Sequence, residues 1–195
     1  MKKRVIRILL CFSIIASVTW AMTTQVEIIP VQMTNELTAV DIDEFIEQRN
    51  PKLDPMVREH IAKCIVKTAK KNHLKTNLVV AWVDTENESW NPLAKSHKGA
   101  VGLTQVIPFY YKTKMEELGI TKNTVYHIDK NLELGCSILR DNLDEFGDLK
   151  LALSGYNAGP TVTRKVGIPK YKETREYIQK VLAMYGELDI NSRSL

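Results

Sequence analysis

Apolar residues recur at intervals of three and four along most of the chain after residue 50. The clearest stripe consists of Leu132, Cys136, Leu139, Leu143 and Phe146. This spacing puts the side chains on one face of an α-helix, which has 3.6 residues per turn. No segment alternates apolar and polar residues, as a half-buried strand does, over more than a few positions. The sequence therefore predicts one mainly α domain over residues 51–187.

Side chains suited to capping indicate where the helices begin. Asp54, Asn77 and Asp129 each precede a periodic segment, and Pro55 after Asp54 is typical of a first helical turn. Helices are therefore predicted from residue 55, over 78–87, from residue 130, and over 149–156 and 173–184.

The first 21 residues have the layout of a secretory signal peptide. A basic head that includes Lys2 and Arg7 precedes an apolar run that ends at Ala21. The run is shorter than the roughly 20 residues that span a bilayer comfortably, so an uncleaved membrane anchor is the second interpretation. We expect export to the periplasm or cell envelope, an arm or linker over 22–50 with a short amphipathic piece, and a tail over 188–195.

The charge balance depends on this amino-terminal segment. The whole chain has 27 Lys and Arg against 23 Asp and Glu, but removal of the segment's four cations would leave 23 of each sign. A neutral mature chain gives no reason to expect a nucleic-acid partner. The four histidines lack metal-ligand spacing, and no glycine-rich phosphate loop follows a strand, so we expect neither a metal nor another cofactor.

Two cysteines, Cys64 and Cys136, remain after the predicted signal peptide. An exported protein meets an oxidising compartment, in which they could form a disulfide. Both also lie on apolar helical stripes, which suits buried thiols equally well. The sequence leaves both alternatives open.

A candidate for chemistry lies where the predicted helix 78–87 ends, in the stretch TENESWNP. A carboxylic acid at the end of an apolar helix is partly desolvated, which raises its pKa and keeps it protonated near neutral pH. Glu86 and Glu88 would point roughly 200° apart on a helix, so they cannot form an acid and base pair in one cleft. Tyr156 and Asn157, farther along, offer groups suited to sugar hydroxyls and acetamido groups.

Four ordered motifs then carry a resemblance. Glu86 is followed by Trp90-Asn91-Pro92, Ala94, Ser96, Gly99-Ala100, Gly102-Leu103 and Gln105; later come Asn131 with Gly135, Ala152 with Tyr156-Asn157-Ala158-Gly159, and the segment IPKYKETREYIQKV. Over about residues 53–185 the chain resembles lytic transglycosylases with a lysozyme-like domain. The resemblance implies helices around a glycan-binding cleft.

The same resemblance implies an activity. The family cleaves the β-1,4 bond between N-acetylmuramic acid (MurNAc) and N-acetylglucosamine (GlcNAc) in peptidoglycan and forms a 1,6-anhydromuramyl product, with one Glu as acid and then base. Because an added residue fits a turn better than a packed helix, Glu86 is favoured as this acid, with Glu88 as the alternative. The substrate-binding residues carried over are Ser96, Gln105, Tyr156, Asn157 and Tyr177.

Two positions depart from the family pattern. Thr104 stands where the family usually has a cleft-lining Met, and Gly155 stands where it usually has Ala. A hydrolytic muramidase and an inactive peptidoglycan-binding scaffold are the alternative functions. The expected partners are peptidoglycan glycan strands and a secretion or pilus-type envelope assembly, since the chain has little room for a further wall-binding domain.

Overall fold

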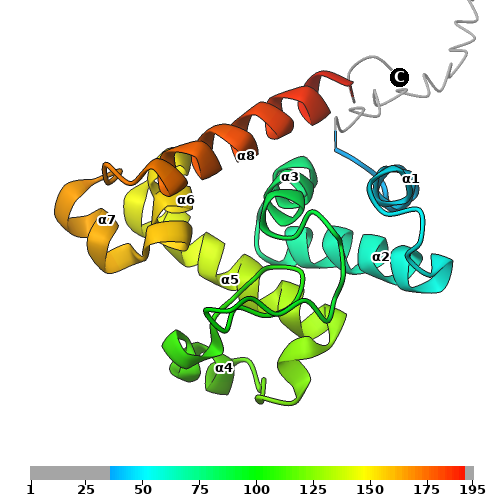
Figure 1. The fold of residues 1–195 in the computed structure, drawn as a ribbon, viewed down its shortest axis with the longest axis horizontal. Helices are drawn as coiled ribbons and strands as arrows, with labels where there is room; N and C mark the ends of the chain where they lie inside the picture. Colours follow the sequence, from blue (N-terminus) through cyan, green and yellow to red (C-terminus); the bar gives the residue numbers. More distant parts are fainter. Residues whose placement is uncertain (1–35, 192–195) are drawn as a thin grey trace, which may run out of the picture. The chain divides into compact units, whose positions relative to one another are not determined.

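The computed structural model describes residues 36–191, which fold into helices joined by turns and loops (Figure 1). In chain order the elements are α1 (Ala39–Arg49), α2 (Pro55–Lys71), α3 (Thr76–Glu86), η1 (Pro108–Tyr110), α4 (Lys112–Glu117), η2 (Thr124–Tyr126), α5 (Ile128–Phe146), α6 (Leu149–Ala158), α7 (Pro160–Val166) and α8 (Lys172–Asn191). Within this range the only β-type pairings are the isolated bridges Lys95–Val101 and Val101–Val106. The predicted mainly α class is confirmed.

Helix α3 occupies a central place in this arrangement. It packs against α2 on one side and α8 on the other, and α6 packs against both α5 and α8 (Figure 1). Nine of the eleven residues of α3 are buried, from Thr76 to Asp84. A helix that is apolar nearly all round is typically buried in a core. Helix α3 is therefore a fixed, buried element, and its last turn ends at Glu86.

Two apolar clusters build the domain. The larger one gathers side chains from α1, α2, α3, α5, α6 and α8, including the fully buried Trp82 and Trp90. The smaller one joins the loop around Val101 and Val106 to Met115 of α4 and Ile138 of α5. Because α5 contributes to both clusters, it fixes the loop that follows α3 relative to the helical core.

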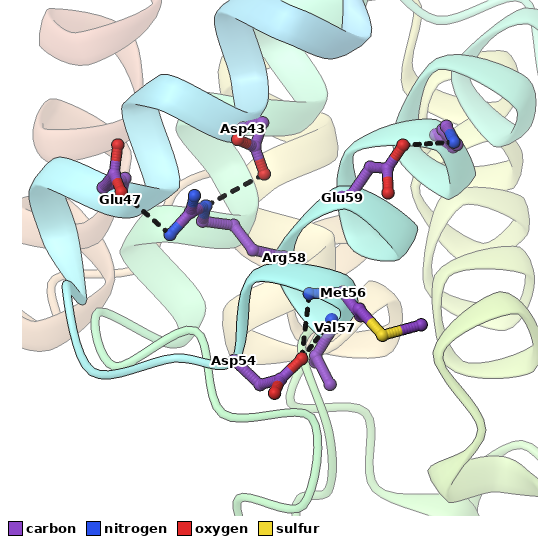
Figure 2. A network of polar contacts seen from close by, with 8 residues as sticks. Asp43, Glu47, Asp54, Met56, Val57, Arg58 and Glu59 are labelled. Carbon is purple, nitrogen blue, oxygen red and sulfur yellow. Dashed lines mark hydrogen bonds and ion pairs between the residues drawn. The ribbon is translucent and has the colours of Figure 1, made fainter.

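The predicted caps are right at one helix and wrong at two. The Asp54 side chain accepts hydrogen bonds from the backbone N–H groups of Met56 and Val57, as Figure 2 shows. Asn77 instead lies inside α3, where its side-chain oxygen accepts from the backbone N–H of Leu37. Asp129 lies in the first turn of α5, where its charge suits the helix dipole without capping.

Residues 39–49, placed by the sequence in an arm or linker, form helix α1 instead. Thr38 and Asp41 form a capping box at its start. Ile42 and Ile46, one turn apart, are fully buried in the larger cluster. This segment is a folded helix because the two isoleucines enter the core and because Arg58 of α2 pairs with Asp43 and Glu47 on its polar side.

Several further predictions concern the two ends of the chain and its cysteines. The predicted signal peptide and anchor lie outside the described residues. Helix α8 continues to Asn191, beyond the predicted domain end at residue 187, and Leu188 is buried. Cys64 and Cys136 are both buried free thiols. No helix within the described range has the length and apolar character needed to cross a bilayer.

Asn131 and Gly135 of α5 hold the loop that carries Thr104. The Asn131 side chain accepts from the Thr104 backbone N–H at 2.9 Å and donates to the Val101 carbonyl at 3.0 Å. Thr104 is fully buried against α5, so the expectation that this position lines the cleft is wrong here. Its hydroxyl donates to the Asn131 side-chain oxygen at 3.0 Å, a partner that Met would lack.

Glycine at the second departure, Gly155, has a packing reason. A Cβ there would lie 2.9 Å from the Phe146 ring and 3.2 Å from the Asn142 side chain. The large Phe146 of α5 therefore takes the space that an alanine methyl group would need.

Replacing Gly135 with Ala is expected to destabilise the domain by about 2–3 kcal/mol. A Cβ at this position would lie 2.5 Å from the Cβ of Thr104, a contact that only backbone movement can relieve. Denaturant unfolding of the purified variant measures the change. Gly186→Ala is the matched control. Residue 186 is exposed within α8 and a Cβ there would meet no other atom, so this change should increase the free energy of unfolding by about 0.5–1 kcal/mol. Equal stability of Gly135→Ala and the wild type would contradict this packing.

Candidate active site

A cleft of about 340 Å³ opens at the carboxyl end of α3. Its lining comes from the last turn of α3 and the loops that follow it: Thr85, Glu86, Asn87, Glu88, Ser89, Ala94, Lys95, Ser96 and Gln105. Three of the predicted site residues, Glu86, Ser96 and Gln105, are thus brought together, and the alternative acid Glu88 lies at the same cleft.

Glu86 is the last residue of α3 and is half-buried. Burial raises the pKa of its carboxyl group from the ordinary 4.5 to about 7, and contacts with Tyr177 and Trp82 act in the opposite direction. The Tyr177 hydroxyl donates to Glu86 Oε1 at 2.6 Å. A carboxyl group with such a pKa is present in both protonation states near neutral pH, which suits general acid and general base chemistry.

Glu88 has a different environment. Its side chain is 77% exposed and lies 3.7 Å from Lys180 of α8. Helix α3 ends at Glu86 with Asn87 as its C-cap, so the helical angle between the two glutamates does not apply. The degree of burial, and not helix geometry, therefore distinguishes the two glutamates: Glu88 is exposed and Glu86 is half-buried.

Asn87 is buried and joins the parts of the turn that follows α3 by hydrogen bonds. Its side-chain amide donates to the carbonyls of Asn91 at 2.8 Å and Gly102 at 3.1 Å. Its side-chain oxygen accepts from the Ser89 hydroxyl at 2.7 Å. These bonds hold the turn 87–91 together and join it to Gly102.

Ser96 and Gln105 line the cleft while bonding to backbone. Ser96 Oγ accepts from the Ala100 N–H at 3.0 Å, and Gln105 Nε2 donates to the Gly102 carbonyl at 2.8 Å. Gln105 has φ of +45°, a conformation that costs a non-glycine residue roughly 1 kcal/mol or more. The loop therefore holds Gln105 in a strained conformation at the cleft.

The remaining predicted residues, Tyr156, Asn157 and Tyr177, are not among the residues that line this cleft. The Tyr156 hydroxyl donates to the Thr104 carbonyl at 2.8 Å. Asn157 Oδ1 accepts from the Thr174 hydroxyl at 2.7 Å, which joins the end of α6 to the start of α8. Tyr177 is buried with its hydroxyl on Glu86. Of these three side chains, Tyr177 is the one that touches the candidate acid.

Two aromatic residues near Glu86, Trp82 and Tyr111, were not predicted as site residues from the sequence. Trp82 lies one turn before Glu86 in α3, is fully buried, and meets the Tyr156 ring edge-on at 4.9 Å. Its indole Nε1 makes no hydrogen bond within the described residues, although it is near enough to lower the pKa of Glu86. Burial, followed by the charges of Asp141 and Glu86, raises the pKa of Tyr111. The i, i+4 spacing from Trp82 to Glu86 was the available signal.

Replacing Tyr177 with Phe is expected to raise the pKa of Glu86 further, by about 1 pH unit. The phenol stabilises the ionised carboxylate by donating to it, so its loss favours the protonated form. Carbon-13 NMR of the Glu86 carboxyl group measures the titration. Tyr185→Phe, on the same helix but two turns farther along, should leave it unchanged. A lowered pKa in Tyr177→Phe would contradict the bond as described.

Replacing Glu86 with Gln is expected to stabilise the protein by about 3 kcal/mol near pH 8 and to have little effect near pH 4. The pKa of Glu86 is higher in the folded chain than in the unfolded chain. The wild type therefore loses stability as the pH rises from 4.5 to about 7, and the full cost remains above that range. Denaturant unfolding at both pH values, with exposed Glu88→Gln as the control, measures this. A variant that is less stable than the wild type near pH 8 would contradict the burial of this charge.

Comparison with known proteins assigns the family. Residues 63–179 match the family model of the transglycosylase SLT domain. A curated protein named Transglycosylase, from Enterobacteria phage PRD1, is 39% identical over 87 residues, which cover 45% of this chain and 30% of that protein.

Solved structures of lytic transglycosylases share the fold. An inactive mutant of Slt from Pseudomonas aeruginosa aligns with a TM-score of 0.60 and 24% identity, over 79% of this chain and 30% of that one. The 70 kDa soluble lytic transglycosylase SLT70 from Escherichia coli aligns with a TM-score of 0.60 and 20% identity, over 78% and 30%. The chain thus spans less than a third of the length of each of these relatives. With 117 of its 195 residues inside the matching region, the chain belongs to the transglycosylase SLT domain family.

Proposed function

We propose that this chain is a peptidoglycan lytic transglycosylase in which Glu86 is the catalytic acid and base. The observation that carries the proposal is a single half-buried carboxyl group at the cleft, with a pKa raised to about 7, in a chain of the SLT family. The other carboxylate of the cleft lining, Glu88, is exposed and ion-paired with Lys180.

In the first half of the proposed reaction, Glu86 is protonated. It donates its proton to the oxygen of the β-1,4 bond between MurNAc and GlcNAc, and that bond breaks as positive charge develops at the muramyl C1. The proton is available because burial keeps a large fraction of Glu86 neutral at physiological pH.

In the second half, the Glu86 carboxylate removes the proton from the 6-hydroxyl of the same muramyl residue. The freed oxygen bonds to C1 and closes the 1,6-anhydro ring, and Glu86 is again protonated for the next turnover. No water is consumed, so no second carboxylate is needed to activate one, in contrast with the usual glycosidase pair.

Digestion of purified sacculi by the full chain tests this function. Mass spectrometry of the soluble fragments should find anhydro-muropeptides, lighter by one water than the products of hydrolysis. Products with reducing ends would identify a hydrolytic muramidase and overturn the proposal. Protein that sediments with sacculi but releases no fragments would identify an inactive peptidoglycan-binding scaffold.

We also propose that residues 1–21 are a signal peptide that directs export to the periplasm or cell envelope, where peptidoglycan is found. We further propose that the enzyme acts together with a secretion or pilus-type envelope assembly. The support for export is the basic head and apolar run of the sequence. Mass spectrometry of the protein from the native envelope should find an amino terminus at Met22, whereas an intact Met1 would indicate an uncleaved anchor.

A further inference from the structure

The end of helix α1 contacts the end of α3 and the turn 87–90 that follows the candidate acid. Arg49 Nη2, at the end of α1, lies 3.2 Å from Asp84 Oδ2. The other oxygen of Asp84 accepts from Trp90 Nε1 at 2.8 Å. Asp84 is 3% exposed, so one buried carboxylate of α3 joins α1 to the residue that closes the turn 87–90.

The turn itself is strained and depends on these contacts. Trp90 is fully buried with φ of +53°, a conformation that bulky residues adopt only when their surroundings impose it. Phe45 of α1 meets the Trp90 ring edge-on at 6.1 Å. Asn50, the C-cap of α1, donates from Nδ2 to the Ser89 carbonyl at 2.7 Å. Helix α1 and its C-cap thus support the turn through three side chains: Phe45, Arg49 and Asn50.

Helix α1 is fixed independently of the turn. Arg58 of α2 lies between Asp43 and Glu47 of α1 (Figure 2). Its Nε is 2.9 Å from Asp43 Oδ1, and its Nη1 is 3.2 Å from Glu47 Oε1. At the other end of α3, the Glu36 carboxylate accepts from the Thr76 backbone N–H at 3.1 Å and pairs with Lys75 at 2.9 Å. Segment 36–50 therefore contacts both ends of α3, and it lies outside residues 63–179 that match the family model.

We infer that Arg49 is a positioning residue for Glu86: it holds Asp84 and, through Asp84, the Trp90 turn that keeps the last turn of α3 folded beside Tyr177. This inference rests on the proposed function of Glu86. Asp84 and Glu86 are separated by about 200° around α3, so Arg49 acts from the face opposite the cleft. Without the pair, Asp84 is a buried charge with one partner fewer, and the end of α3 is free to fray.

Fraying would change Glu86 in a measurable way. The groups that face Glu86 are Tyr177 from α8, Tyr156 from α6, Tyr111 and Trp82. A carboxyl group that moves away from them into water loses the desolvation that raises its pKa. Arg49→Met should therefore bring the Glu86 titration down from about 7 toward 4.5 and lower the glycan-cleaving rate near neutral pH by roughly a hundredfold.

The experiment compares four variants of the full chain by carbon-13 NMR titration of Glu86, thermal melting and sacculus digestion. Arg49→Met removes the pair, and Arg49→Lys keeps the charge and should restore the wild-type titration. Arg49→Met/Asp84→Asn avoids an unpaired buried charge and preserves an oxygen for Trp90, in case Arg49→Met does not fold. Glu36→Gln loosens the distant end of α3 and should lower the melting temperature without moving the Glu86 titration.

The outcomes separate positioning from simple stability. A lowered Glu86 titration in the variants without Arg49, absent in Arg49→Lys and Glu36→Gln, supports the inference. A Glu86 titration equal to that of the wild type in the folded variants without Arg49, or an equal shift in Glu36→Gln, overturns it. If the wild type releases no glycan fragments, the proposed function fails, while the titration still decides whether Arg49 positions Glu86.

Discussion

Glu86→Gln is expected to lower the rate at which the protein solubilises sacculi by roughly a thousandfold or more. Glutamine has nearly the same shape but can neither donate the proton to the glycosidic oxygen nor take one from the 6-hydroxyl. The same group serves both halves of the proposed reaction, so both are lost. Release of soluble muropeptides with time measures the rate.

The matched control for this loss is Glu88→Gln. Both changes neutralise one carboxylate at the same cleft, two residues apart. Glu88 is exposed and paired with Lys180, and exposed ion pairs contribute little, so this variant should keep nearly wild-type activity. Activity that survives in Glu86→Gln and disappears in Glu88→Gln would reverse the assignment.

Trp90→Ala is expected to cost about 3–5 kcal/mol of folding free energy. Trp90 is fully buried between α1 and the end of α3, and its indole N–H satisfies the buried Asp84 carboxylate. The variant leaves both a cavity and a poorly partnered charge. Denaturant unfolding monitored by circular dichroism gives the value.

Leu93→Ala is the control for that measurement. Leu93 belongs to the same loop but is 68% exposed, so its truncation should change stability by less than about 0.5 kcal/mol. Similar losses in the two variants would show that Trp90 is not the anchor of the turn.

The family motifs anticipated which residues share the candidate cleft better than they anticipated what surrounds it. The family resemblance placed Glu86, Ser96 and Gln105 in one site, and the structure brings them to a common cleft, where their closeness in the chain makes this possible. Tyr177 is 91 residues away from Glu86, and its contact with the acid could be anticipated only through the family resemblance. The strained φ of Gln105 and Trp90 left no sequence signal, since neither is a residue that favours it.

Helix α1 shows why the rest could not be predicted. Its apolar content is low, and two isoleucines four residues apart give only one turn of periodicity. Their burial depends on the packing of α1 against the rest of the core, above all α2, and the Arg49–Asp84 pair joins side chains that are 35 residues apart in the chain. Asn77 illustrates the same limit: its side chain was suited to a cap, but a backbone N–H 40 residues earlier became its partner.

Burial raises the pKa of Glu86 to about 7, so that a large fraction of the carboxyl group is protonated near neutral pH. The most direct test of this raised pKa is a carbon-13 NMR titration of the Glu86 carboxyl group, combined with the pH dependence of glycan cleavage by the same protein. We predict that Glu86 titrates near pH 7 and that the rate falls with the same midpoint as the pH rises. A Glu86 titration near the ordinary 4.5, with full cleavage activity at neutral pH, would contradict the account.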